Sequence, residues 1–226
     1  MNLQIVDLEK KIKQTTIFSN INISVNPTDI FCILGRNGIG KTTLLKTIVG
    51  LQRQTSGSIL YSNETINKND IGFLLENHDF YPFLNGYDHI VHTLKNKNIN
   101  EQDSYFPYLK TLFNLESFIH KKCKTYSLGQ NQKLAICLAV IAKPKIIILD
   151  EPTNSLDIEA IFKLRQLLSF LKSKGHIILL TSHNISEVSK VSNRILYMKS
   201  STEHEELKFK EGENMDLEEY FKERVI

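Results

Sequence analysis

The chain has 226 residues, of which 41% are hydrophobic and 23% charged, a balance that is typical of a soluble globular protein and excludes a disordered or fibrous one. This length suits one α/β domain or two very small ones. The 28 basic and 25 acidic residues leave a net charge of +3 with no strong basic block, so nucleic acid is not expected as the main partner.

The amino-terminal segment carries acidic residues early and has no continuous apolar core, so it is not expected to be a signal peptide. The longest apolar stretch, Leu134–Ala142, is about half of the ~20 residues that a helix needs to cross a bilayer. We therefore expect a cytoplasmic protein without direct membrane insertion, held at a membrane only through a partner.

Short, nearly continuous apolar runs predict the strands. In chain order these runs are Ile30–Leu34, Ile71–Leu75, Ile146–Leu149, His176–Thr181 and Ile195–Met198. Strands that are apolar at nearly every position are typical of a parallel sheet covered on both faces. Cys32 and Cys137 lie inside apolar runs and are predicted to be core residues. With Cys123 they form neither a disulfide framework nor a metal-binding pair.

Helical patterns with recognisable ends lie between these runs. One helix is predicted over Thr42–Val49. Asp157 is expected to cap a second helix, which has apolar residues at helical spacing and stops at Gly175. Asn184 followed by Glu187 resembles a capping box and opens a short third helix. This alternation of strands and helices predicts a wound α/β core.

One stretch breaks the alternation. Residues 77–124 are rich in Asn, Lys, Tyr and Phe and lack strand-like runs, so we expect residues 77–134 to form a mostly helical subdomain inserted into a core of residues 1–76 and 135–202. Residues 203–226 form an acidic tail, predicted to be helical near Leu217–Arg224. Because no linker or repeat is present, the expected organisation is a single domain over residues 1–226.

A glycine-rich segment predicts a phosphate-binding loop. Its residues, Gly35-Arg36-Asn37-Gly38-Ile39-Gly40-Lys41-Thr42, fit the pattern G-x4-G-K-[ST] between a predicted strand and a predicted helix. Glycines let the backbone fold around phosphates with its N–H groups inward, and the helix N-terminus adds positive potential. We expect the nucleotide to bind over Gly35–Thr43, with Lys41 at the β and γ phosphates and the Thr42 hydroxyl on Mg²⁺.

Two acids follow another buried strand. Asp150 and Glu151 come directly after the run that ends at Leu149, at the sheet edge where ligands bind in wound α/β folds. Asp150 is expected to hold the Mg²⁺ shell and Glu151 to polarise the water that attacks the γ-phosphate. Such a pair can also form a plain solvated turn. His183 follows the next strand and is expected to donate to the γ-phosphate, although a lone histidine is often structural.

With these residues in place, the chain resembles the ATP-binding subunit of an ABC transporter over essentially its whole length. The segment Tyr126-Ser127-Leu128-Gly129-Gln130 is similar to the family's signature sequence, Ser155-Leu156-Asp157 to its D-loop, and His183 to its switch histidine. The resemblance implies an α/β P-loop NTPase cassette with a largely parallel sheet flanked by helices and an inserted helical subdomain. It also implies ATP and Mg²⁺ as cofactors.

The resemblance further implies two partners. In the family, two cassettes enclose ATP head to tail, so Ser127, Gly129, Gln130 and Asp157 of one chain would meet the nucleotide held by the other, as in a homodimer. The alternative is that Ser127 only caps a helix. The second implied partner is an integral-membrane permease, whose coupling helix would dock near Phe80, Tyr81, Phe83 and Tyr87, although core packing would also explain these aromatic residues.

Three positions depart from the family pattern. Leu128 replaces the first signature glycine, and Ile12 stands where the family has an aromatic residue for adenine stacking. Glu76 replaces the usual glutamine, which resembles the bacitracin-resistance and lantibiotic-immunity branch, unless it is a neutral replacement. A carboxylate at this position binds Mg²⁺ more strongly than an amide does but repels the γ-phosphate, so Glu76 is expected to act with the metal.

The expected function is that of an ATP-hydrolysing subunit at the cytoplasmic face of the membrane. It would power a separate permease that exports an antimicrobial peptide or a similar amphiphile. One alternative is a non-transport cassette that acts on ribosomes or DNA, which the resemblance disfavours because such relatives are fused pairs or carry long coiled coils. Another is a nucleotide-dependent switch with negligible turnover, in which Glu151 would not affect hydrolysis.

Overall fold

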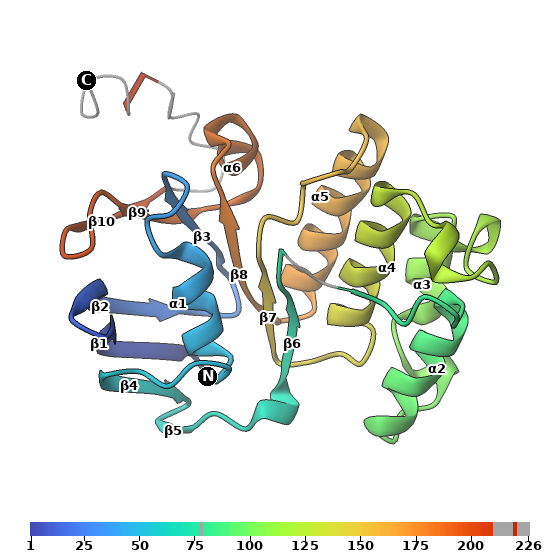
Figure 1. Cartoon of the computed structure of the whole chain (residues 1–226), viewed down its shortest axis with the longest axis horizontal. Coiled ribbons are helices and arrows are strands. Elements are labelled where there is room, and N and C mark those ends of the chain that lie inside the picture. The colour runs from blue at the N-terminus through green and yellow to red at the C-terminus, as the bar shows by residue number, and fades with distance from the viewer. Residues whose placement is uncertain (77–78, 210–218, 221–226) are drawn as a thin grey trace.

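The computed structural model describes residues 1–76, 79–209 and 219–220, and the strands of this part of the chain form two sheets (Figure 1). The larger sheet has the order β10-β9-β3-β8-β7-β6, with parallel pairing throughout except between β9 and β10. Its strands are β3 (Ile30–Gly35), β6 (Ile71–Leu74), β7 (Ile146–Leu149), β8 (Ile177–Ser182), β9 (Arg194–Met198) and β10 (His204–Lys208). The strands predicted from apolar runs are thus confirmed.

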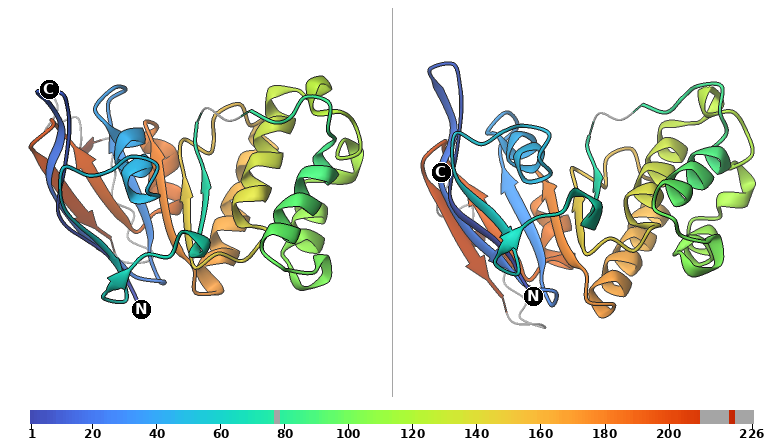
Figure 2. Two further views of the ribbon diagram at one scale, coloured as in Figure 1. Left: turned by 60° about the horizontal axis from the view of Figure 1, so that its bottom comes forward. Right: turned by 90° about the horizontal axis from the view of Figure 1, so that it is seen from below.

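Side chains of the larger sheet alternate between two hydrophobic cores. Cys32 and Leu34 of β3 join the core formed with the helices α4 (Leu128–Val140) and α5 (Ile158–Ser173). Phe31 and Ile33 join the core formed with α1 (Lys41–Ile48) and the smaller sheet. Figure 2 shows these layers, with α1 and the blue antiparallel strands on one side of the sheet and the green and yellow helices on the other. Covering on both faces explains why these strands are apolar at nearly every position.

The smaller sheet is antiparallel, with the order β2-β1-β4-β5. It contains β1 (Leu3–Ile12), β2 (Thr15–Val25), β4 (Ser56–Tyr61) and β5 (Glu64–Thr65). Continuous apolar runs do not predict these strands, because their residues alternate between core and solvent. The alternation in β1 is itself interrupted, since the register shifts between Ile5 and Leu8 and Asp7 has a positive φ of 48°.

The helices of the described chain cover both faces of the larger sheet. They are α1 (Lys41–Ile48), α2 (Gly86–Asn96), α3 (Phe106–Leu112), α4 (Leu128–Val140), α5 (Ile158–Ser173) and α6 (Ile185–Val191), with 3-10 turns at Lys68–Asp70, Glu101–Asp103, Leu115–Ser117 and Cys123–Thr125. Asp157 caps α5 as predicted, accepting from the Ala160 N–H at 2.7 Å. At α6 only half of the predicted capping box forms, because Asn184 accepts from the Glu187 N–H while the Glu187 carboxylate binds Arg165 instead.

The described elements between β6 and β7 are all helices or 3-10 turns, and they lie beside α5 at one end of the molecule (Figure 1). The sequence-based boundary at residue 134 falls within α4, which is continuous from this helical region onto the sheet. α4 packs closely on β6, since a Cβ on Gly72 would lie 1.8 Å from the Ala139 carbonyl oxygen. Phe80 and Tyr87 pack against the core, whereas Tyr81 and Phe83 are 72% and 71% exposed.

At the carboxyl end, residues 204–208 form β10 and pair with β9, so the segment predicted to be a tail begins as part of the sheet. Of the helix predicted near residues 217–224, only Glu219 and Tyr220 lie within the described residues, and both are helical. Burial raises the pKa of the Cys32 and Cys137 thiols, which agrees with their predicted place in the core. None of the helices in the described part of the chain has the length and apolar character that crossing a membrane requires.

Candidate active site

A cleft of about 440 Å³ opens at the carboxyl ends of the parallel strands. The loops that follow β3, β8, β7 and β6, which are neighbours in the sheet, all contribute to it. Its lining residues are Ile17, Asn37, Gly38, Gly40, Lys41, Thr42, Thr43, Glu76, Glu151 and His183. The topology therefore brings together residues from five separate parts of the sequence, at the edge of the sheet where ligands bind in wound α/β folds.

The glycine-rich loop forms one wall of this cleft. Gly38 and Gly40 have φ angles of 81° and 113°, which favour glycine, and α1 begins at the next residue with no side-chain cap on its N–H groups. Lys41 is buried, and its Nζ donates to the Gly35 carbonyl at 2.8 Å. A helix N-terminus and an ammonium group on one loop are suited to bind phosphate.

Glu151 lies opposite this loop and is only 5% exposed. One carboxylate oxygen is 3.6 Å from Lys41 Nζ, and the other is 2.9 Å from His183 Nδ1. The backbone of Glu151 has a positive φ of 49°, which is uncommon for a residue with a side chain. The structure thus places the Glu151 carboxylate between the Lys41 ammonium and the His183 imidazole, and it contacts both.

Asp150, the residue before it, is fully buried and does not line the cleft. Its Oδ1 accepts from the Thr181 hydroxyl at 2.6 Å, whereas its buried Oδ2 has no hydrogen-bond partner among the described residues. A buried carboxylate oxygen that lacks a partner is unusual and fits an atom that binds a metal or its water shell.

The donor set fits Mg²⁺ in particular. The described residues hold no group of three His, Cys, Asp or Glu side chains that could bind a metal ion by themselves. Mg²⁺ usually keeps several waters and is bound through one or two carboxylates and substrate phosphates. Thr42 and Glu76 line the same cleft as the phosphate-loop residues, so Thr42, Glu76 and Asp150 could together hold such an ion, which would neutralise phosphate charge when bound.

Glu76 is exposed at the start of the loop after β6, and Asn154 from the loop after β7 donates to its Oε1 at 3.5 Å. The contact joins two of the loops that border the cleft. Among the described residues, the other carboxylate oxygen of Glu76 has no hydrogen-bond partner, so it could bind a cation or its water.

The remaining predicted site residues do not line the cleft. Ser127 caps α4 through a reciprocal capping box with Gln130, with bonds of 3.1 and 3.2 Å. Asp157, which caps α5, is bound by Lys133 of α4 at 3.4 Å, and the hydrogen bond from Ala160 N–H lowers the pKa of the Asp157 carboxyl. Ser127 therefore does cap a helix, as the alternative interpretation expected. The four residues of this group lie together at the adjoining N-termini of α4 and α5: Ser127, Gly129, Gln130 and Asp157.

This second group is tied to the helical region by Tyr126. The Tyr126 hydroxyl donates to the Ile119 carbonyl and accepts from the Gly86 N–H, at 3.2 and 3.1 Å. Burial raises the pKa of Tyr126 to about 12. The residues of the predicted site therefore form two separate groups within one chain, one in the cleft and one at the start of α4.

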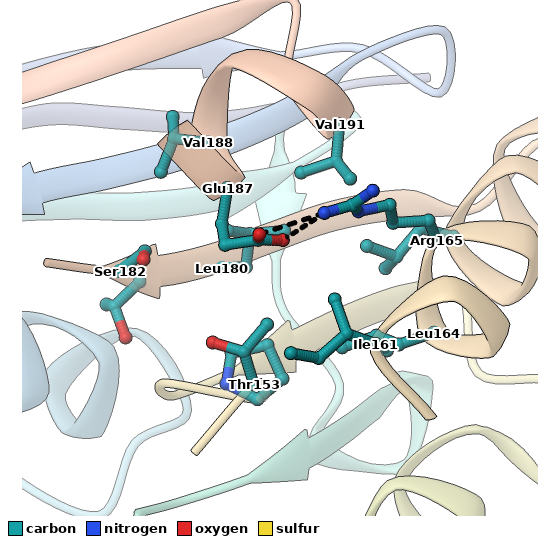
Figure 3. Close-up of a pocket in the computed structure, with 12 residues that line it drawn as sticks. Thr153, Ile161, Leu164, Arg165, Leu180, Ser182, Glu187, Val188 and Val191 are labelled. Carbon is teal, nitrogen blue, oxygen red and sulfur yellow. Dashed lines mark hydrogen bonds and ion pairs between the residues drawn. The ribbon is translucent and has the colours of Figure 1, made fainter. Parts of the chain in front are cut away.

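A small apolar cavity of about 20 Å³ lies between α5, α6 and β8 (Figure 3). Ile161, Leu164 and Val191 face it, and Arg165 of α5 is joined across it to Glu187 of α6 by two bonds of 2.9 and 2.6 Å. The pair links α5 to the helix that directly follows His183.

Sequence reasoning missed two residues of the site. Ile17 of β2 lines the cleft, and no sequence signal distinguishes it from other apolar strand residues. Thr181 of β8 bonds both to Asp150 and to the backbone of Glu151. The signal for Thr181 was its hydroxyl at the end of an otherwise apolar buried strand, two residues before His183. Among residues of the glycine-rich loop, Arg36 and Ile39 do not line the cleft, and Gly35 contributes its carbonyl to Lys41.

The cleft can therefore bind a di- or triphosphate and act on it chemically. Loop amides and Lys41 would bind phosphate oxygens. Glu151 lies close enough to the Lys41 ammonium to orient a water at a bound terminal phosphate, and His183 could donate to the same phosphate.

Comparison with known proteins agrees with this geometry. The family model for "ABC transporter" matches residues 18–154, and a model for an AAA domain matches residues 124–189. The lantibiotic transport ATP-binding protein SrtF of Streptococcus pyogenes is 32% identical over 227 residues, which cover 99% of this chain and 97% of SrtF. The uncharacterized ABC transporter ATP-binding protein YdbJ of Bacillus subtilis (strain 168) is 36% identical over 201 residues, covering 86% of this chain and 65% of YdbJ.

Solved structures share the fold. The ATP-binding subunit of an ABC transporter superposes with a TM-score of 0.87 at 22% identity, covering 100% of this chain and 95% of that chain. The dimeric post-hydrolysis form of the ATP-binding cassette MJ0796, bound to ADP and Pi, superposes with a TM-score of 0.81 at 24% identity, covering 92% of this chain and 99% of that chain.

Fold and site together define a P-loop ATPase of the cassette type. The chain belongs to the ABC transporter family, in which it is an ATP-binding subunit and an ATPase. The fold class and the family resemblance predicted from the sequence are thereby confirmed, as is ATP as its nucleotide.

Proposed function

We propose that this ATPase subunit drives the export of an antimicrobial peptide or a similar amphiphile through a separate membrane permease. The observation that carries the proposal is the match to the lantibiotic transport protein SrtF, which spans 99% of this chain and 97% of SrtF. Relatives named for spermidine and putrescine import are also 30% identical, but the chain spans only 56–58% of their length. Glu76 in place of the usual glutamine supports the same branch.

In this proposal the cleft residues divide the reaction among themselves. Lys41 and the loop amides bind the β and γ phosphates, while Thr42, Glu76 and Asp150 hold Mg²⁺. Glu151 polarises the attacking water, and His183 donates to the γ-phosphate. The contacts of Glu151 support this division, because its carboxylate lies 3.6 Å from the Lys41 ammonium and 2.9 Å from the His183 imidazole.

We further propose that two copies act together. The separation of Ser127, Gly129, Gln130 and Asp157 from the cleft supports this, since one chain does not gather both groups around one nucleotide. In a head-to-tail pair, the Ser127 hydroxyl of one copy, which accepts from the Gln130 N–H, would donate its hydrogen to the γ-phosphate held by the other copy.

Mixing two inactive variants tests the pairing. Ser127→Ala and Glu151→Gln should each abolish hydrolysis alone. A mixture should recover about a quarter of the wild-type rate, because half of the dimers are mixed and each mixed dimer contains one intact site. No recovery, combined with hydrolysis by monomeric wild type, would contradict the shared site.

The surface for the permease is proposed at the exposed aromatic side chains before α2. Tyr81 and Phe83 are largely exposed, Leu84 is 42% exposed, and the Lys124 ammonium lies 5.5 Å from the centre of the Phe83 ring. Exposed aromatic residues beside a cation suit a contact with a helix that carries apolar and acidic side chains. Through this contact the subunit would lie at the cytoplasmic face of the membrane.

Growth inhibition tests the export step. The gene should be deleted from the strain that carries it, and the deletion should be complemented with the wild-type gene or with Glu151→Gln. Wild type should raise the minimum inhibitory concentration of a lantibiotic or of bacitracin, and Glu151→Gln should not. Equal sensitivity of the deleted and the complemented strains to both classes of compound would refute this substrate class while leaving the ATPase assignment intact.

A further inference from the structure

We propose that Thr181 is a positioning residue for ATP hydrolysis, which holds the carboxylate of Asp150 and the backbone of Glu151 through one hydroxyl group. The inference rests on the proposed roles of these two acids. Thr181 does not line the cleft, so it acts through them rather than on the nucleotide.

The directions of the two hydrogen bonds are fixed by their chemistry. The Glu151 backbone N–H can only donate, so the Thr181 Oγ1 accepts from it at 2.8 Å. The single hydroxyl hydrogen is then left for Asp150 Oδ1, which lies 2.6 Å away and accepts. Thr181 is fully buried, so both bonds are shielded from bulk water.

The bond to Asp150 determines which oxygen stays available. With Oδ1 bound to Thr181, the buried Oδ2 is the oxygen that has no partner among the described residues. Groups that bind the ligands of a metal fix their orientation and basicity. Thr181 would therefore hold Asp150 in the orientation that presents Oδ2 to Mg²⁺ or to its water shell.

The bond to Glu151 acts on the backbone. Glu151 has a positive φ of 49° in a buried setting, a conformation that persists only where its surroundings fix it. The hydrogen bond from its N–H to Thr181 satisfies the buried amide and stabilises this conformation. The backbone at Glu151 sets the direction in which its carboxylate leaves the chain towards Lys41 and His183.

Strand register explains why this position serves both acids. Leu149 of β7 pairs with Leu180 of β8, so the residues that follow on the two parallel strands are also neighbours. The preceding residues of β8, Ile177–Leu180, are all apolar and buried. A buried hydroxyl at position 181 therefore needs hydrogen-bond partners, because burying it without them would cost free energy. His183, which contacts Glu151, comes two residues later, directly after the end of β8.

The test compares Thr181→Val, which keeps the shape and removes the hydroxyl, with Thr181→Ser, which keeps the hydroxyl. Thr47→Val is the matched control, because Thr47 is also a buried threonine, and within the described residues its hydroxyl bonds only to the Thr43 carbonyl of its own helix. Three quantities are measured: the kcat for Mg-ATP, the affinity for a fluorescent ATP analogue without metal, and the Mn²⁺ affinity of the ADP-bound protein by electron paramagnetic resonance.

We expect Thr181→Val to lower kcat and to weaken Mn²⁺ binding, each about 10–100-fold, as is usual when a group that orients a metal ligand is lost. Metal-free nucleotide affinity should stay within about twofold of wild type, because the phosphate loop is untouched. Thr181→Ser should restore both kcat and Mn²⁺ affinity, and Thr47→Val should resemble wild type.

A Thr181→Val protein with wild-type kcat and Mn²⁺ affinity would overturn the inference, as would losses no larger than those of Thr47→Val. A merely structural role would lower the melting temperature and leave both quantities unchanged. If Thr181→Val does not fold, Thr181→Cys replaces it, since a thiol is a poor hydrogen-bond partner, and a wild-type rate would again overturn the inference. A wild-type chain that fails to bind or hydrolyse Mg-ATP would instead refute the proposed function.

Discussion

The ion pair between α5 and α6 allows us to predict how much the protein loses in stability when the pair is broken. Arg165 binds both carboxylate oxygens of Glu187, at 2.9 and 2.6 Å, and the two side chains are only 21% and 18% exposed. Arg165 Nε is buried and has no partner among the described residues. Glu187→Ala therefore leaves a largely buried guanidinium without its carboxylate.

Loss of these charge-assisted bonds should lower the free energy of unfolding by about 2 kcal/mol. For a chain of this size, that corresponds to a fall in the melting temperature of about 4–8 °C. The measurement is thermal unfolding followed by circular dichroism. Because α6 directly follows His183, the ATPase rate measured below the melting temperature should fall as well.

An exposed ion pair on α5, the helix that carries Arg165, provides a matched control. Glu159 of α5 binds Lys163 at 2.5 Å but is 78% exposed, so Glu159→Ala should cost no more than about 0.5 kcal/mol. The double variant Arg165→Met, Glu187→Leu should be more stable than Glu187→Ala, since apolar side chains would replace the pair beside an apolar cavity. Equal melting temperatures for Glu187→Ala and Glu159→Ala would refute the reasoning from burial.

Three further predictions address the nucleotide, the metal and pH. Lys41→Ala should weaken ATP binding about 100-fold in a fluorescent-nucleotide titration, because the buried ammonium is lost; retained affinity would contradict the phosphate-loop assignment. Glu76→Gln should keep most of the ATPase activity and Glu76→Ala should lose much of it, whereas equal rates in all three proteins would show that Glu76 takes no part. Burial lowers the pKa of His176, so the unfolded chain binds the proton more readily and stability should fall as the pH drops below about 6.5. His176→Asn, which can keep the bond to the Pro144 carbonyl, should lose less melting temperature between pH 7.5 and 5.5, and a parallel decline in both proteins would count against this cause.

Sequence patterns predicted the parts of this fold that are determined by residues close together in the chain. The parallel strands are apolar at nearly every position because both faces are covered, so Ile30–Leu34 and Ile146–Leu149 were recognisable as short runs. The glycine-rich loop was recognisable because its backbone conformation and its charge are both encoded within a few neighbouring residues. The capping of α4 by Ser127 was visible for the same reason.

What the sequence did not reveal depends on contacts between distant residues. The antiparallel strands alternate imperfectly, and a register shift after Ile5 breaks the pattern. The Glu187 carboxylate binds Arg165, 22 positions away, instead of completing the local cap. Thr181 acquires its partners only when β8 lies beside β7, 31 positions from Asp150 in the chain. Patterns within a short sequence window cannot predict contacts between residues so far apart in the chain.

The close packing of β6 on α4 links the two parts of the proposed dimeric site. α4 starts at the residue after Ser127, and farther along it the Ala139 carbonyl leaves no room for a methyl group on Gly72. β6 is an edge strand, which pairs with β7 alone among the described strands, and Glu76 lies two residues after it ends. A shift of α4 when a second copy binds its first turn would therefore displace this edge strand before the inner strands. The carboxylate of Glu76 would then move relative to Lys41, so that each copy could sense the arrival of the other through the spacing of its own metal ligands.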